Sequence, residues 1–223
     1  RLAGSATGTT FILSGDNSGF SGGFARATAL PVIIKNPKAL SKITRLELSS
    51  HAGGSLGNNK IANQSGGSLV FENNPAIFLN GGDGIMLESD YTIDFGTNTV
   101  TFDDTNAGRN CPLTINAPRV KIGGASIQTG ATNGYFKKGP GILEVSGPAS
   151  YLGNTTVADG VFLAKNPAAF SPLSALCLKK SVTGGILGLG YGDFTNAVGT
   201  TAGCFYSENG GGYSPTGGWA AYG

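Results

Sequence analysis

The sequence predicts an all-β protein built as a right-handed parallel β-helix, a solenoid of about ten coils. Short alternating apolar runs, a high glycine content and an internal recurrence predict this fold. Glycine accounts for 38 of the 223 residues, yet 39% of the residues are apolar, so the chain can form a core. No segment of 10 or more residues repeats with the helical period of about 3.6. Strands and tight corners are therefore expected throughout.

Apolar and polar residues alternate over short runs, as expected for strands with one buried face. In chain order, the expected strands are 11–13, 32–34, 46–48, 69–71, 85–87, 91–95, 100–102, 113–115, 120–122, 143–145, 161–163 and 176–178. Gly-Gly, Asn-Gly and Asn-Pro pairs lie between them and favour tight corners. The side chains predicted to stack in the core are Leu46, Leu48, Phe71, Ile93, Phe95, Leu143, Val145, Val161, Leu163, Leu176 and Leu178.

The second half of the chain resembles the first, with 9–57 matching 141–188. Four blocks recur in the same order at a nearly constant offset: 11–15 at 143–147, 35–41 at 165–171, 46–48 at 176–178, and 53–57 at 184–188. Ordered recurrence favours stacked coils of roughly 20 to 25 residues each. A β-sandwich is the alternative fold, but it gives no reason for the recurrence.

The chain divides into a β-helical repeat domain, 1–204, and a glycine-rich contact segment, 205–223. This segment carries Tyr206, Tyr213, Trp219 and Tyr222. Aromatic side chains on a glycine background suit contact with another subunit or with a glycan, and they also suit a cap over the last coil. We expect a subunit contact that includes Phe11 and Leu13 at the other end of the chain, because an unpaired edge strand is avoided in proteins.

Catalytic, cofactor and metal sites are not predicted. His51 is the only histidine and lies in an expected corner, without an identifiable serine and acid partner. Asp103 and Asp104 are the one candidate pair for a metal ion, but two acids supply too few of the six to eight oxygens that calcium needs. A solvated turn is the simpler interpretation of this pair.

Charge and cysteine content exclude further classes. The charged residues behind the net charge of +2 are spread thinly along the chain, so no nucleic-acid partner is expected. The sequence contains no stretch of 18 apolar residues, so no membrane-spanning helix is expected. The cysteines are Cys111, Cys177 and Cys204, an odd number. The spacing between Cys177 and Cys204 is close to the length of one coil, so this pair is the disulfide candidate.

Residues 136–163 begin Phe-Lys-Lys-Gly-Pro-Gly-Ile-Leu-Glu-Val-Ser-Gly and continue with Tyr151, Gly153, Thr155, Val157 and Gly160. This stretch resembles the passenger-associated transport repeat of bacterial autotransporters, K-x-G-x-G-x-L-x-L-x-G. Two positions depart from the pattern, since Ala149 stands where the family usually has Asn and Asn154 where a second Gly is common. Residues 9–24 resemble a partial copy, and 217–223 resembles the Gly-Gly-Phe-Ala-Ala-Tyr-Gly tract of some large bacterial repeat proteins.

The resemblance implies a secreted bacterial protein that is extracellular or displayed at the cell surface. It also implies a processed passenger or one module of a longer array. We expect a non-enzymatic structural module without cofactors, a homo-oligomer that assembles by head-to-tail stacking into a filament or surface array. The alternatives are a monomeric adhesin that binds a host or matrix glycan and, last, a polysaccharide lyase.

Overall fold

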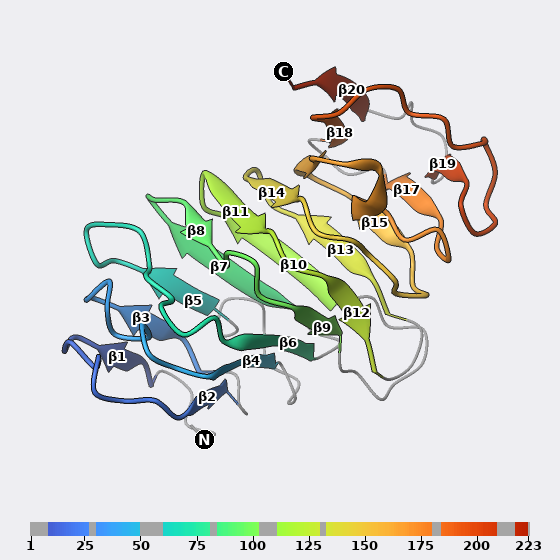
Figure 1. Ribbon diagram of the computed structural model, residues 1–223. Helices are drawn as coiled ribbons and strands as arrows, with labels where there is room; N and C mark the ends of the chain where they lie inside the picture. The colour runs from blue at the N-terminus through green and yellow to red at the C-terminus, as the bar shows by residue number, and fades with distance from the viewer. Residues whose placement is uncertain are drawn as a thin grey trace.

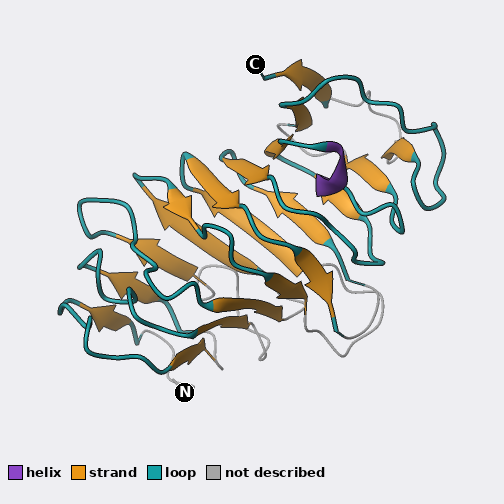
Figure 2. Ribbon diagram, in the orientation of Figure 1, coloured by secondary structure: helices purple, strands orange, loops and turns teal. Residues whose placement is uncertain are grey.

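The computed structural model describes residues 9–26, 30–49, 60–80, 84–102, 111–129, 133–179, 184–208 and 217–222. Across these residues, the regular structure consists of short strands and one 3-10 helix, η2 (Pro167–Ala169) (Figure 2). The strands are β1 (Phe11–Leu13), β2 (Gly23–Arg26), β3 (Val32–Ile34), β4 (Arg45–Ser49), β5 (Lys60–Asn63), β6 (Ala76–Asn80), β7 (Ile85–Ser89), β8 (Ile93–Asp94), β9 (Val100–Phe102), β10 (Cys111–Asn116), β11 (Arg119–Ile122), β12 (Ser126–Gln128), β13 (Tyr135–Lys138), β14 (Ile142–Val145), β15 (Thr155–Val157), β16 (Gly160–Ala164), β17 (Leu176–Lys179), β18 (Gly185–Leu189), β19 (Phe205–Glu208) and β20 (Gly218–Ala221). The all-β class is confirmed.

The strands stack into three sheets, and every pairing between the described strands is parallel. The nine-stranded sheet has the order β1-β3-β5-β7-β10-β13-β15-β17-β19, the six-stranded sheet β20-β18-β16-β14-β11-β8, and the five-stranded sheet β12-β9-β6-β4-β2. Within each sheet, a strand therefore pairs with strands of the coils before and after it, and only the strands at the ends of a sheet have a single neighbour among the described strands, which makes a β-solenoid (Figure 1). A sandwich is built from antiparallel sheets, so the alternative prediction was wrong.

The coils are fewer and more uneven than predicted. The longest sheet has nine strands and the others six and five, so the predicted ten coils are not reached. The sequence separation between residues in register gives the length of a coil. Val32 is in register with Ile61 and Lys137 with Val157, so the coil that begins at Val32 is the longer of the two. Corners of different length account for this spread, because the strands themselves must keep stacking.

Which sheets a coil uses changes along the chain. The early strands alternate between the nine- and five-stranded sheets. The first coil with a strand in each of the three sheets consists of β7, β8 and β9. From β13 onward the strands alternate between the nine- and six-stranded sheets. The two ends of the solenoid are therefore built differently.

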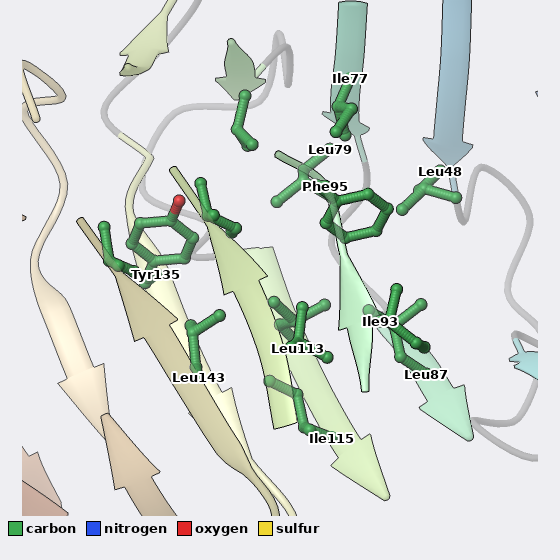
Figure 3. Close-up of a cluster of buried hydrophobic side chains, with 14 of the residues drawn as sticks. Leu48, Ile77, Leu79, Leu87, Ile93, Phe95, Leu113, Ile115, Tyr135 and Leu143 are labelled. Carbon is green, nitrogen blue, oxygen red and sulfur yellow. The ribbon is translucent and has the colours of Figure 1, made fainter. Parts of the chain in front are cut away.

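The core consists of ladders of apolar side chains that run from coil to coil. In the six-stranded sheet, Ile93, Val120, Leu143, Phe162 and Leu187 are in register, and none is more than 1% exposed. Figure 3 shows part of the apolar core, with side chains from several strands directed at one another. The predicted core residues are buried as expected, except that Phe71 is only partly buried against the core.

The direction of two predicted core residues was wrong. Val161 and Leu163 are buried, but Phe162 between them is the residue in register with Leu143 and faces the core. Val161 and Leu163 therefore lie on the outer face of β16. The run Val-Phe-Leu-Ala has no polar residue to mark a face, so alternation gave no guide to its orientation.

The matched segments that begin at Asn36 and Asn166 form the same corner. The carbonyl oxygen of each asparagine accepts the amide of the alanine three residues later, at 3.0 and 3.1 Å. Leu40 and Phe170, which follow those alanines, are both buried. The strands that precede these corners, β3 and β16, lie in different sheets. The recurring unit is thus a strand together with the corner that follows it, and its two copies lie on different faces of the solenoid.

Candidate functional site

The C-terminal end of the solenoid finishes in two strands, β19 and β20. Phe205 in β19 stacks in register on Leu176, and Trp219 in β20 stacks on Leu187. Both aromatic side chains thus continue the ladders of the core. Trp219 is the last side chain of its ladder among the described residues, and 47% of it is exposed.

Phe194 joins these residues from the connection between β18 and β19. Its ring centroid lies 4.8 Å from that of Trp219 and 6.3 Å from that of Phe205, and the rings of Phe205 and Trp219 are 4.6 Å apart. Phe194 also contacts Phe170 at 5.9 Å, which connects the group to the buried aromatic residues of the core. We call Phe194, Phe205 and Trp219 the tail cluster. It forms an apolar end face that is partly open to solvent.

The two tail strands differ in the state of their outer edges. Phe205 of β19 donates its amide to the carbonyl oxygen of Ala197 at 2.7 Å, and its own carbonyl oxygen accepts the amide of Gly199 at 2.8 Å. The connection before β19 thus covers the outer edge of that strand at Phe205. In the described part of the chain, β20 pairs with β18 alone. The open strand edge at the tail belongs to β20.

The N-terminal end presents β1 and β2, each with one neighbouring strand among the described residues. Phe11 and Leu13 in β1 are partly buried and pack against the core. Ile12 between them faces away from the core and is 53% exposed. Phe20, in the corner before β2, is also largely exposed. We call this surface the head end.

The structure separates the aromatic residues that the sequence grouped as subunit contacts. Tyr206 lies on the outer face of the nine-stranded sheet, in register with Cys177, and its hydroxyl accepts a hydrogen bond from Asn154 at 3.3 Å. Tyr222 lies on the outer face of the six-stranded sheet, where its Cε2 atom would be 2.8 Å from a Cβ at Gly188. Both tyrosines contact their own chain beside the end face.

Of the tyrosine and tryptophan residues predicted to contact another subunit, Trp219 lies on the end face, and Tyr213 lies outside the described residues. Phe194 and Phe205 were missed as members of the tail cluster. Both lie on segments that precede β20, too far from Trp219 along the chain for a local pattern to join them.

The cysteine pair does not form a bridge in the structure. Cys177 and Cys204 are both present as thiols. Cys177 is in register with Tyr206, and the carbonyl oxygen of Cys204 accepts the amide of Leu176, so the two cysteines are offset along their strands. The side chain of Cys111 lies outside the described residues.

Lys137 is a charged side chain in the core that the sequence analysis did not identify. It is 0% exposed and in register with Leu113. Its ammonium group donates hydrogen bonds to the carbonyl oxygens of Lys138 at 2.9 Å, Gly139 at 2.6 Å and Asp159 at 2.9 Å. Burial lowers the pKa of Lys137 to about 7, while the negative charge of Asp159 opposes this shift. The ammonium thus joins the corner between β13 and β14 to the corner between β15 and β16, where Asp159 lies.

The candidates for chemistry fall outside the described residues, since His51, Asp103 and Asp104 are among those not described. Within the described residues, no cluster of three or more histidine, cysteine or acidic side chains could hold a metal ion. No helix in that part of the chain is long and apolar enough to span a bilayer.

Comparison with protein-family models, with curated proteins and with solved structures gave no match.

Proposed function

We propose that the protein is a non-enzymatic extracellular structural module that assembles end to end into a filament or surface array. The observation that carries this proposal is the position of Trp219. Its side chain ends a buried ladder, packs on Phe194 and Phe205, and still leaves about half of its surface in water. Exposed aromatic residues at the end of a core favour contact with another protein surface.

The head end supports the same proposal. A solenoid buries each coil against the next, so its first and last coils expose core and backbone unless something covers them. Phe11 and Leu13 are partly buried, and Ile12 and Phe20 are more exposed. An apolar tail and an apolar head on one chain are complementary, and contact between different surfaces of identical copies propagates as an open chain unless its rotation closes a ring.

The resemblance of residues 136–163 to the transport repeat supports an exported, autotransporter-like passenger at the bacterial surface. We further infer a right-handed solenoid, because connections between parallel strands of one sheet are right-handed in about 98% of cases.

The test is to place a charge on the end face. We expect Trp219→Glu to abolish assembly, since a carboxylate would have to be buried between copies without a partner. Tyr91→Glu is the matched control: Tyr91 is an aromatic residue in the corner between β7 and β8, it is 40% exposed, and its variant should assemble normally. Light scattering and negative-stain images measure the assembly, and circular dichroism checks that both variants fold.

Tryptophan fluorescence gives a second readout, because Trp219 is the only tryptophan. Its emission should shift to the blue as protein concentration rises and the side chain leaves water. A wild-type chain that stays near 22.5 kDa at all concentrations, with unshifted emission, would overturn the proposal and favour a monomeric passenger.

A further inference from the structure

The strand edges at the two ends restrict how copies can join, an inference that rests on the proposed end-to-end assembly. At the tail, the edge of β19 is already paired at Phe205 with Ala197 and Gly199, whereas β20 has an open edge in the described part of the chain. At the head, β3 is the only neighbour of β1 among the described strands, which leaves the opposite edge of β1 open there. The strand of a second copy that adds to the tail therefore finds backbone groups available at β20.

The backbone groups on these two edges match in phase. The amide of Phe11 and the carbonyl oxygen of Leu13 bond toward the β3 side, to Pro31 and Lys35. Backbone direction alternates along a strand, so the amide and carbonyl of Ile12 point to the open edge.

The same reasoning applies to the tail strand. The amide of Tyr222 bonds to the carbonyl oxygen of Leu189, on the β18 side. By alternation, the backbone groups of Trp219 and Ala221 point to the open edge of β20. In a parallel pair, a residue whose backbone groups point to the partner strand bonds to the two residues on either side of the one opposite it. If Trp219 lies opposite Phe11, its outward amide and carbonyl meet the outward groups of the residues that flank Phe11, one of which is Ile12.

The internal recurrence supplies a template for this joint. Residues 11–15 match 143–147, which places β1 in correspondence with β14. The next strands in the two sheets, β3 and β16, correspond as well, and they precede the matched corners. Among the described strands, β14 has a neighbour on each edge, β11 and β16, whereas β1 has β3 alone. The position that β11 fills beside β14 is the position left open beside β1.

We propose that β1 of one copy adds in parallel to the open edge of β20 of another copy, with Phe11 opposite Trp219 and Leu13 opposite Ala221. These four side chains all face the core side of their strands, since Trp219 and Ala221 are in register with Leu187 and Leu189. The joint extends the aromatic ladder of the tail cluster into the next copy. It continues the six-stranded sheet of one copy as the nine-stranded sheet of the next.

A joint between different sheets fixes the rotation between copies. The solenoid has three faces, so matching the six-stranded sheet to the nine-stranded sheet turns each copy by one face, about a third of a turn. The same displacement by one face relates the matched corners at Asn36 and Asn166 within the chain.

Cysteine pairs on the outer face test the register. Ile12 and Ala220 would lie opposite each other at the proposed joint, about 4.8 Å apart between Cα atoms, a separation that a disulfide tolerates. The variant carrying Ile12→Cys and Ala220→Cys should form a covalent ladder of multimers under mild oxidation. Peptide mass spectrometry should then assign the bridge to positions 12 and 220 rather than to the native cysteines.

The matched control carries Ile12→Cys and Tyr206→Cys in a Cys177→Ser background, because position 206 is in register with Cys177 and could otherwise bridge to it within the chain. This variant reports the alternative in which β1 adds to β19. It should give no 12–206 bridge. Filaments that form without a 12–220 bridge, or with a 12–206 bridge, would overturn this register and leave end-to-end assembly standing. Wild-type protein that never assembles would instead overturn the proposed function, and this joint with it.

Discussion

At the scale of single residues, Lys137 shows how a charge is kept inside an apolar solenoid. The side chain is fully buried, and its ammonium is surrounded by the carbonyl oxygens of Lys138, Gly139 and Asp159. Main-chain carbonyls at a corner cannot all be satisfied by strand pairing, and an unpaired buried acceptor is costly. Lys137 provides donors to two successive corners, the one between β13 and β14 and, through Asp159, the one between β15 and β16.

Lys137 makes stability depend on pH in a direction that can be worked out. Its pKa is lowered from 10.5 to about 7 in the folded chain, so the unfolded chain binds more protons between these values. The free energy of unfolding should therefore rise as pH increases from about 7 to 10.5, by at most about 1.4 kcal/mol per pH unit. As pH falls, this gain is lost, and the loss is complete once the pH is below the folded pKa.

The variant Lys137→Met removes the titrating group, so the difference in unfolding free energy between wild type and variant should change over this interval. Urea unfolding at pH 7 and pH 9 measures it. Lys138→Met is the control, because it retains Lys137 and should follow the wild-type profile. A difference between wild type and Lys137→Met that stays constant with pH would contradict the assignment.

At the scale of elements, glycines set how closely one corner stacks on the next. A Cβ at Gly147 would lie 1.8 Å from the carbonyl oxygen of Gly124, and a Cβ at Gly124 would lie 2.1 Å from the carbonyl oxygen of Asn98. The neighbouring atoms are backbone, which cannot rotate away. These glycines are therefore required for the spacing of the coils, beyond any role in turn geometry.

We expect Gly147→Ala to lower the free energy of unfolding by at least about 2 kcal/mol, because the corner must shift or strain the strands on either side. Gly67→Ala is the matched control, since a Cβ there would meet no atom within 4 Å and φ is not left-handed. Thermal unfolding followed by circular dichroism compares the two variants. Equal melting temperatures would show that the corners have more room than the structure indicates.

At the scale of the whole molecule, contacts run from each coil to the next, so the ends can be removed without destroying the middle. Deletion of residues 205–223 removes β19, β20 and two members of the tail cluster. We expect the shortened chain to retain its β-sheet signal, melt at a lower temperature because Leu176 and Leu187 lose their register partners, and remain monomeric. Gel filtration and circular dichroism measure these outcomes, and polymers as long as those of the full chain would contradict them.

The alternating runs and the recurrent corners were enough to predict an all-β solenoid and most of its core. Alternation reports the local burial of one strand face, which is why Leu143 and Val145 were correctly placed inside. The same rule failed at β16, where four consecutive apolar residues leave the inward face unmarked, and it could not reveal that Lys137 occupies an inward position.

The tertiary structure alone decided which residues meet at the ends. Phe194 reaches Trp219 from the connection between β18 and β19, and Ala197 and Gly199 close the edge of β19. These contacts depend on the path of a corner over the last coil, which periodicity does not encode. By itself the sequence determined the kind of strand and corner that stack, because those depend on neighbours along the chain. Coil number, the faces that each strand joins and the composition of the tail cluster depend on packing between residues far apart in sequence, and only the folded molecule settles them.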